Sequence, residues 1–591
     1  MNYAASAHPG ITAKLPGWRA RVLFAMLLAT LAALLGRGVY LQGIHDDFLQ
    51  KKGNARYSRV IEVSAHRGMI TDRHGEPLAV STPVESVWAS PPDVEADSRQ
   101  VKKLAHILGM NAEELKNRLF DTSRDFVYLK RQLPPDQAEQ VVSLNLPGVS
   151  LQREYRRYYP AGEEAAQTLG FTGQDDVGQE GLELLLQEQL AGKPGSQRVI
   201  KDRRGRIVEE TGRLHAPKHG SDVALSIDSK VQYLAYRELK HAVEQHRAKA
   251  GAVVVLDARS GEVLALANYP GFNPNNRNNT GSKAMRNRAI ADLFEPGSTM
   301  KPFTVATAIE TGKVYPNTVI NTGNGVLTVG NKTILDVHPE ATLTVAQIIQ
   351  KSSNVGAAKI ALAIKSETLW QSLSDSGFGE KTGSGFPGEA AGKLRDPKTW
   401  RPIEQATLSY GHGISVNLLQ LARAYTIFAS GGELKPVTLL KLDEPEAGVG
   451  LNGVETNGIR SNGKRIFSER TVRAMCDMLE RVTLPGGTAP LAQVTGYRVA
   501  GKTGTAHKLE QGRYVDRYVA SFVGFAPVSN PRLVVAVMID EPGNGQYNGG
   551  QVAAPVFSKV TGAALRALNV PNDAPLDNVL ASPVEVIKEE V

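Results

Sequence analysis

The sequence predicts an α+β protein that carries one membrane-spanning helix and at least two folded domains. Its 591 residues exceed the roughly 250–300 residues at which a single hydrophobic core stops growing. An apolar run near the N-terminus is long enough to cross a membrane, and strand patterns enclose a long helical stretch in the second half. Apolar residues make up 41% and charged residues 22% of the chain, which excludes a disordered protein. The net charge of +8 suits anionic polymers or lipids but is too small to indicate nucleic-acid binding.

The first predicted element is a transmembrane helix over residues 22–42, after a cytoplasmic tail of residues 1–21. It reads VLFAMLLATLAALLGRGVYLQ and reaches the ~20 residues that a membrane span needs. Lys14, Arg19 and Arg21 precede it, so the positive-inside rule places the N-terminus in the cytoplasm and everything after residue 42 outside. A cleaved signal peptide is the competing interpretation. No A-x-A-like site follows Leu35, which favours an uncleaved anchor.

Residues 43–220 predict a mixed α/β domain. Residues 64–81 read as strand, turn and strand, residues 97–145 have helical spacing, and residues 190–210 return to a β-hairpin pattern. This region contains no evident catalytic group. The histidines are scattered and no C-x-x-C occurs, so we expect neither a metal nor a cofactor. The single cysteine, Cys476, excludes an internal disulfide and reads as a core residue.

Residues 221–565 predict a second, α+β domain. The strand-like VALSI is followed by Asp228 as a candidate helix N-cap and then by a long amphipathic helix. Residues 250–270 form two strands with a turn at Ser260–Gly261, and residues 518–540 repeat this pattern with Pro531 in the turn. Helical patterning lies between them, so one sheet is assembled from both ends of the domain. The C-terminal tail, residues 566–591, is expected to add little.

The stretch LFEPGSTMKPFT, residues 293–304, holds a candidate nucleophile. Ser298 and Lys301 are spaced i,i+3, so a helix places both side chains on one face. A serine hydroxyl becomes a good nucleophile only when a base takes its proton, and a lysine amine can be that base. Pro302 disfavours helical geometry at Lys301 unless the pair lies in the first turn. The S-x-x-K spacing alone is weak, because chance produces it in a chain of this length.

Two further motifs strengthen the nucleophile hypothesis. Ser352-Ser353-Asn354 lies between two predicted helices, and its hydroxyl and amide can relay a proton and hold a substrate amide. Lys502-Thr503-Gly504-Thr505 follows the apolar YRVA. A strand edge there can bind an extended peptide, while the lysine and the hydroxyls receive a carboxylate.

Each motif also has an imitation elsewhere in the chain. Ser461–Lys464 repeats S-x-x-K, but its Asn-Gly predicts a turn rather than a helix. Ser415–Asn417 repeats S-x-N. Lys381–Gly383 repeats K-T-G in a glycine-rich loop without a following strand, so we reject it.

S-x-x-K, S-x-N and K-T-G, in this order, are the motif set of penicillin-recognising serine enzymes, which the chain resembles. Seven further stretches are similar to class B penicillin-binding proteins: HRGMITDRHGEPLA, REYRRYYPAG, GQEGLE, GAVVVLD, DVHPEATLTVAQIIQKSSNVG, SYGHGISV and SFVGFAP. The match closely resembles the division-specific, FtsI-type septal peptidoglycan D,D-transpeptidases. The resemblance covers residues 20 to about 560. It implies a non-catalytic, dimerisation-type pedestal domain and a transpeptidase domain whose central antiparallel sheet is flanked by helices. No glycosyltransferase domain is apparent before residue 220, which argues against a bifunctional class A protein.

The resemblance also implies a role for each motif residue. Ser298 attacks the D-Ala-D-Ala amide of a stem peptide, Lys301 acts as base, Ser352 passes the proton on and Asn354 holds Lys301 and the substrate amide. The backbone N–H groups of Ser298 and Thr505 form the oxyanion hole. The expected substrate-binding residues are Lys502, Thr503, Gly504, Thr505, Ser353, Tyr410 and His412. Arg67, Gly68, Glu180 and Glu183 are expected to be structural, with Arg67 tying the first domain to the second.

The resemblance also implies a location and partners. The implied location is the cytoplasmic (inner) membrane at the division septum, with the catalytic domain in the periplasm. The implied partners are stem peptides, β-lactams as covalent inhibitors, an FtsW-type (SEDS-class) glycan polymerase and further division proteins. Three competing functions stay open: a side-wall transpeptidase of the elongation type, which shares the same chemistry, a membrane-anchored β-lactam sensor or hydrolase, and a non-catalytic scaffold.

Overall fold

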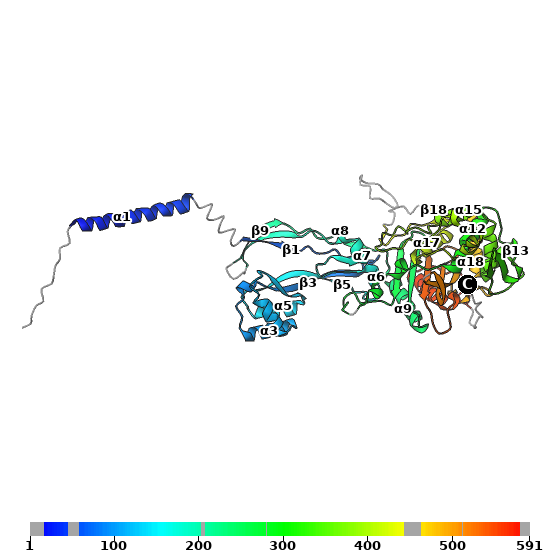
Figure 1. Cartoon of the computed structure of the whole chain (residues 1–591), viewed down its shortest axis with the longest axis horizontal. Helices are drawn as coiled ribbons and strands as arrows, with labels where there is room; N and C mark the ends of the chain where they lie inside the picture. The colour runs from blue at the N-terminus through cyan, green and yellow to red at the C-terminus, as the bar shows by residue number, and fades with distance from the viewer. Residues whose placement is uncertain are drawn as a thin grey trace, which may run out of the picture. The chain divides into compact units, whose positions relative to one another are not determined.

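The computed structural model describes residues 17–44, 58–201, 207–278, 280–442, 463–510 and 512–579. Contacts divide the chain into two units. The colours of Figure 1 follow the residue number along the chain. The first unit comprises residues 1–64, 84–154 and 194–218, and the second comprises residues 65–83, 155–193 and 219–591. The sequence predicted a single boundary at residue 220. By these contacts, residues 65–83 and 155–193, which precede residue 220, group with the second unit.

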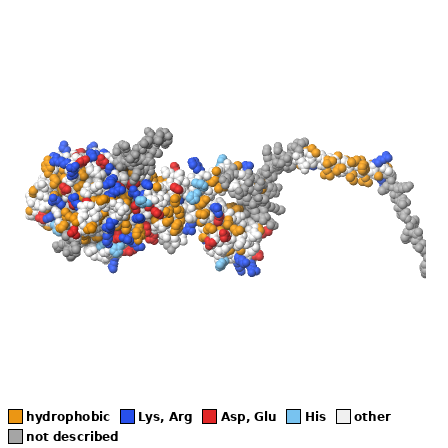
Figure 2. Space-filling model, turned by 180° about the vertical axis from the view of Figure 1, so that it is seen from behind, with side chains coloured by type: hydrophobic (Ala, Val, Ile, Leu, Met, Phe, Trp, Pro, Cys, Tyr) orange, Lys and Arg blue, Asp and Glu red, His pale blue; other side chains and the backbone are white. Residues whose placement is uncertain are grey.

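The N-terminal helix α1 (Gly17–Val39) continues as a π-helix, Tyr40–Ile44. The apolar window within residues 17–42 has a mean hydropathy of 2.1, and this helix is long and apolar enough to cross a membrane. Figure 2 shows apolar side chains along it and basic side chains at one end. The helix begins at Gly17 rather than at Val22, so the basic residues Arg19 and Arg21 belong to it.

The first unit has a sheet and a small helical core. β1 (Ser58–Val63), β8 (Gly195–Lys201) and β9 (Ile207–His215) form an antiparallel sheet, in which β8 and β9 are the predicted hairpin. The predicted helices are α3 (Ser98–Leu108), α4 (Ala112–Leu119) and α5 (Pro135–Ser143). Their apolar faces share one core with β4 (Val127–Leu133), and α3 begins at a capping box of Asp97 and Gln100.

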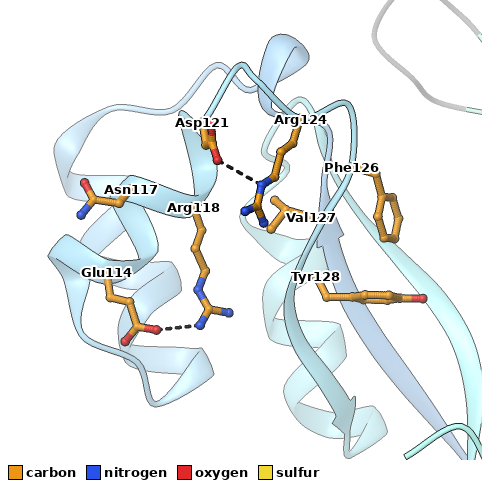
Figure 3. A pocket seen from close by; sticks show the side chains of 8 residues that line it. All are labelled: Glu114, Asn117, Arg118, Asp121, Arg124, Phe126, Val127 and Tyr128. Carbon is orange, nitrogen blue, oxygen red and sulfur yellow. Dashed lines mark hydrogen bonds and ion pairs between the residues drawn. The ribbon is translucent and has the colours of Figure 1, made fainter.

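A surface depression of about 670 Å³ lies between α4 and β4 (Figure 3). Two ion pairs, Arg118 with Glu114 and Arg124 with Asp121, stand on its wall. Phe126 and Tyr128 lie beside them, with ring centroids 4.8 Å apart. Both arginines are exposed and paired, so this depression offers no buried catalytic group.

The second unit is built on a five-stranded antiparallel sheet in the order β12-β11-β21-β20-β19. β11 (Ala250–Asp257) and β12 (Val263–Tyr269) come from the start of the domain, and β19 (Ala500–Glu510), β20 (Arg513–Ala526) and β21 (Leu533–Asp540) from its end. The prediction of one sheet from both ends is confirmed. Every residue of β11 and β21 is buried, because helices cover both faces of the sheet.

Helices fill the space around this sheet (Figure 1). α9 (Ser229–Gln245) begins at the predicted cap Asp228, whose carboxylate accepts from the N–H groups of Lys230 and Val231. The other main helices are α12 (Lys301–Glu310), α13 (Val345–Lys351), α14 (Asn354–Leu362), α15 (Ser366–Asp375), α16 (Pro402–Leu408), α17 (Leu418–Ala429), α18 (Glu469–Arg481) and α20 (Ala554–Ala567). Two small two-stranded sheets lie between α12 and α13. β13 (Val319–Asn321) pairs with β16 (Thr342–Thr344), and β14 (Val326–Val329) forms a hairpin with β15 (Lys332–Leu335).

The N-terminal segments of the second unit are joined by a buried ionic network. Glu183, in α7 (Gly181–Leu185), accepts from Arg67 Nε at 2.8 Å and from Arg157 Nε at 2.6 Å. All three side chains are at most 1% exposed. Arg67 and Glu183 are structural, as expected. The hydrogen-bond partners found for Arg67, however, are Asp176, Glu183 and Gln187, which all lie within residues 43–220, so these bonds do not tie Arg67 to the second predicted domain. Glu180 is exposed and starts α7 without a side-chain capping bond.

Two further expectations differ from the structure. The predicted strand VALSI forms a regular strand only at β10 (Val223–Ala224), which pairs in parallel with β2 (Ile70–Thr71), because Ser226 hydrogen-bonds out of the strand to Leu439. The segment after residue 566 was expected to contribute little to the fold. Its described part instead makes hydrogen bonds to the rest of the second unit. Asp573 accepts from the backbone N–H of Arg498 at 2.7 Å.

Candidate active site

Ser298 lies in a short 3₁₀ turn, Gly297–Met300, directly before α12. Gly297 has φ +58°, a region that favours glycine. Pro302 is the second residue of α12, where the missing N–H breaks no helical hydrogen bond. Ser298 is 1% and Lys301 0% exposed. The structure thus places both residues in the first turn, as the sequence predicted.

Lys301 Nζ is surrounded by four oxygen atoms. It lies 2.8 Å from Ser298 Oγ, 3.0 Å from Ser352 Oγ, 2.5 Å from the Ser352 carbonyl oxygen and 2.7 Å from Asn354 Oδ1. The carbonyl and amide oxygens can only accept, so the amine donates to both. A neutral amine has two N–H groups, and its lone pair is then left for a hydroxyl proton. The geometry therefore suits Lys301 to take the proton of Ser298.

The second motif reaches Lys301 because the chain turns sharply between α13 and α14. Ser352 ends α13 with φ +62° and ψ +39°, a left-handed conformation that residues with a Cβ rarely adopt. Ser353 is the N-cap of α14, and its Oγ accepts from Gly356 N at 2.9 Å. The same Oγ donates to Asp336 at 2.6 Å. Ser353, expected to bind substrate, is instead engaged in holding the turn, whereas Ser352 and Asn354 contact Lys301.

The third motif lies on β19, the last strand in the sheet order. Lys502 Nζ is 3.1 Å from Thr503 Oγ1, and Thr505 Oγ1 accepts from Gly549 N at 3.0 Å. A Cβ on Gly504 would lie 2.7 Å from the carbonyl oxygen of Pro296. One on Gly297 would lie 3.3 Å from the carbonyl oxygen of Thr505. These close approaches bring the strand of Thr505 against the turn that carries Ser298.

Tyr410 and His412 lie beside the same turn. A Cβ on Gly411, between them, would lie 2.2 Å from the carbonyl oxygen of Gly297. The His412 ring stacks on Tyr514, with centroids 5.6 Å apart, and Tyr410 meets it edge-on at 5.3 Å. Burial lowers the pKa of His412 to about 4, with smaller effects from His507 and Lys301, and burial raises the pKa of Tyr410. His412 is therefore neutral at neutral pH.

Sequence reasoning missed two carboxylates at this site. Glu295, three residues before Ser298, accepts from Gly413 N at 2.9 Å and from the hydroxyl of Tyr514 at 3.0 Å. Burial raises its pKa. Asp336 binds the backbone of the second motif. A charge inside the apolar LFEPGST was the available signal for Glu295. Asp336 begins the stretch DVHPEATLTVAQIIQKSSNVG, but only the β14–β15 hairpin shows that it reaches the start of α14.

The imitation motifs are used structurally. Asn417 caps α17, and its Oδ1 accepts from Gln420 N at 2.7 Å. Thr382, in the second K-T-G, donates its N–H to Glu389 at 2.6 Å inside a loop. Ser461 lies outside the described residues.

Comparisons with known proteins identify two domain families in this chain. Residues 251–562 match the penicillin binding protein transpeptidase domain, and residues 62–225 match the penicillin-binding protein dimerisation domain. The chain is 43% identical over 557 residues, 93% of each chain, to the probable peptidoglycan D,D-transpeptidase PenA of Neisseria meningitidis. It is 43% identical over 564 residues, 94% of this chain and 93% of the other, to the peptidoglycan D,D-transpeptidase FtsI of Escherichia coli.

Two solved structures are also similar. The TP domain of Burkholderia pseudomallei penicillin-binding protein 3 is 50% identical, with a TM-score of 0.53 over 59% of this chain and 98% of that one. A peptidoglycan synthetase from Bifidobacterium adolescentis is 25% identical, with a TM-score of 0.68 over 90% of this chain and all of that one.

Proposed function

We propose that this chain, which belongs to the penicillin-binding proteins that join a dimerisation domain to a transpeptidase domain, is a peptidoglycan D,D-transpeptidase. One observation carries the proposal. Lys301 Nζ contacts the oxygen atoms of Ser298, Ser352 and Asn354 inside a buried site. This is the arrangement that a serine needs to attack an amide at neutral pH.

Acylation begins when Ser298 Oγ attacks the carbonyl carbon between the two D-alanines of a stem peptide. Its proton passes to Lys301 Nζ, 2.8 Å away. The backbone N–H groups of Ser298 and Thr505 bind the oxyanion, a contribution of about 3–4 kcal/mol per donor in serine enzymes. The C–N bond then breaks, and the proton travels through Ser352 Oγ to the leaving amine. D-Alanine departs and an ester remains on Ser298.

The rest of the site binds the substrate and completes the transfer. Lys502, Thr503 and Thr505 receive the terminal carboxylate, while β19 pairs with the extended peptide. Tyr410 and His412 line the cleft. An amine of a neighbouring stem peptide attacks the ester, Ser298 regains a proton, and the new amide is the cross-link. A β-lactam acylates Ser298 in the same way and stays bound.

Labelling with a fluorescent penicillin tests the assignment of Ser298. Full-length protein in membranes should become labelled, and Ser298→Ala should abolish the label. Ser282→Ala, an exposed serine near the site in sequence, is the matched control and should label as the parent does. Labelling of Ser298→Ala would overturn the assignment.

We assign the septal role on the likeness to FtsI, with the catalytic unit in the periplasm and α1 in the inner membrane. The basic residues before and within α1 support an N-terminus in the cytoplasm. The partner class is an FtsW-type glycan polymerase that contacts α1 in the membrane. A fluorescent fusion should concentrate at midcell and cross-link to such a polymerase from α1. A side-wall signal would favour a transpeptidase of the elongation type.

A further inference from the structure

The second motif is held by the end of a neighbouring hairpin. Asp336 directly follows β15, and one of its oxygens, Oδ1, accepts from the backbone N–H groups of Asn354 at 2.5 Å and Val355 at 2.9 Å. The other oxygen, Oδ2, accepts from Ser353 Oγ at 2.6 Å. The first N–H groups of a helix have no partner within it, and its N-terminus favours negative charge. Asp336 therefore supplies the hydrogen-bond acceptor and the negative charge that favour the N-terminus of α14.

The same strand end orients the Asn354 side chain. Asn354 Nδ2 donates to the carbonyl oxygen of Leu335 at 3.3 Å, while its Oδ1 lies 2.7 Å from Lys301 Nζ. An amide that donates on one side must present its oxygen on the other. Leu335 and Asp336 thus hold both the backbone and the amide of Asn354.

Ser352 needs such a restraint. It sits in a left-handed conformation, at φ +62°, between α13 and α14. A residue with a Cβ stays in that region only where its surroundings hold it. Its Oγ and carbonyl oxygen both contact Lys301, so a relaxed turn would remove two of the four oxygens around the amine.

We propose that Asp336 is a positioning residue for acylation: its carboxylate holds the Ser352–Asn354 turn in the orientation that brings Ser352 Oγ and Asn354 Oδ1 to Lys301 Nζ. The inference rests on the proposed function. Asp336 acts through the turn and touches neither Ser298 nor Lys301 in any hydrogen bond found among the described residues. The β14–β15 hairpin thereby helps to position the residues that contact Lys301.

Acylation kinetics of the full-length protein in detergent test this role. Progress curves with a fluorescent penicillin separate the dissociation constant of the non-covalent complex from the acylation rate constant. Asp336→Ala should lower the rate constant about 100-fold, the loss typical of a misplaced catalytic group. The dissociation constant should change by less than about threefold, since Lys502, Thr503 and Thr505 keep their places.

Asp336→Asn gives a graded test that preserves shape. Its Oδ1 still accepts from the two backbone N–H groups, but its Nδ2 cannot accept the proton of Ser353. The rate constant should fall about tenfold, the loss of one charge-assisted hydrogen bond. If Asp336→Ala does not fold, this variant decides the question, and a rate constant equal to that of the parent overturns the proposal.

A matched control separates positioning from stability. Asp97 also places a carboxylate at a helix N-terminus, accepting from Gln100 N at 2.7 Å, but it lies in the first unit. Asp97→Ala should lower the Tm and leave the rate constant unchanged. If Asp336→Ala behaves like Asp97→Ala, with a lower Tm and the parental rate constant, its role is structural only and the proposal fails.

A double-mutant cycle identifies the path of the effect. If Asp336 acts through the turn, combining Asp336→Ala with Ser353→Ala should cost less than the product of the two single losses. If the loss in the double variant equals the product of the two single losses, Asp336 does not act through Ser353 and the turn, and the proposed path is overturned. The failure of the proposed function gives a different result, because Ser298→Ala would then remain labelled. If Ser298 is labelled normally and the Asp336 variants keep the parental acylation rate constant, only the positioning role is refuted.

Discussion

Gly504 shows how tightly the nucleophile turn and the third motif are packed. A Cβ there would lie 2.4 Å from Ser521 Oγ and 2.7 Å from the backbone oxygen of Pro296, and backbone cannot move aside cheaply. Gly504→Ala should therefore push β19 away from Ser298 and lower the acylation rate constant about 100-fold. Gly281→Ala is the control, because nothing lies within 4 Å of its Cβ position and its φ is ordinary. Penicillin acylation rates of both variants check this, and equal rates would contradict it.

His412 predicts a specific pH behaviour. Because burial lowers its pKa to about 4, the neutral imidazole persists from about pH 5 upward and does not titrate in the working range. His412→Gln should thus slow acylation, through loss of the stack on Tyr514, without changing the shape of the pH–rate profile between about pH 5.5 and 8. Acylation rates measured across that range check it. If one limb of the pH–rate profile disappears in the variant, His412 does titrate in that range and the prediction is wrong.

At the scale of elements, the buried ionic network joins α7 to the segments around Arg67 and Arg157. Both arginines share Glu183, which is 0% exposed. Glu183→Ala removes the carboxylate that both buried arginines share and should destabilise the second unit by about 3–5 kcal/mol. Glu180→Ala, at the exposed start of the same helix, should change stability by less than about 0.5 kcal/mol. Thermal unfolding of the full-length variants measures the difference, and similar Tm values would refute the network's role.

At the scale of the whole molecule, α1 is separable from the chemistry. No residue of α1 is buried against the rest of the chain, and its length suits a membrane span. Deleting residues 1–44 should release the protein from membranes and leave the penicillin acylation rate unchanged. Fractionation after carbonate washing and labelling of the soluble fraction measure both outcomes. A deletion variant that remains in the membrane would show a second membrane-binding surface.

The sequence by itself determined which motifs the chain carries and most of its elements. The three motifs, their order, the sheet built from both ends and the apolar helix all follow from local patterns: residue spacing, strand alternation, and caps such as Asp228. These signals are short in range, so reading them needs no knowledge of the folded chain.

Only the tertiary structure decided how the motifs meet and what supports them. Ser352 and Ser353 are chemically alike, yet one contacts Lys301 and the other caps α14, because the left-handed turn at Ser352 points them apart. Asp336 joins them from a hairpin whose path no local pattern specifies. The grouping of residues 65–83 and 155–193 with the second unit depends on contacts of the same kind. Contacts between residues distant in sequence depend on the packing of the whole domain, and one sequence carries no direct record of them.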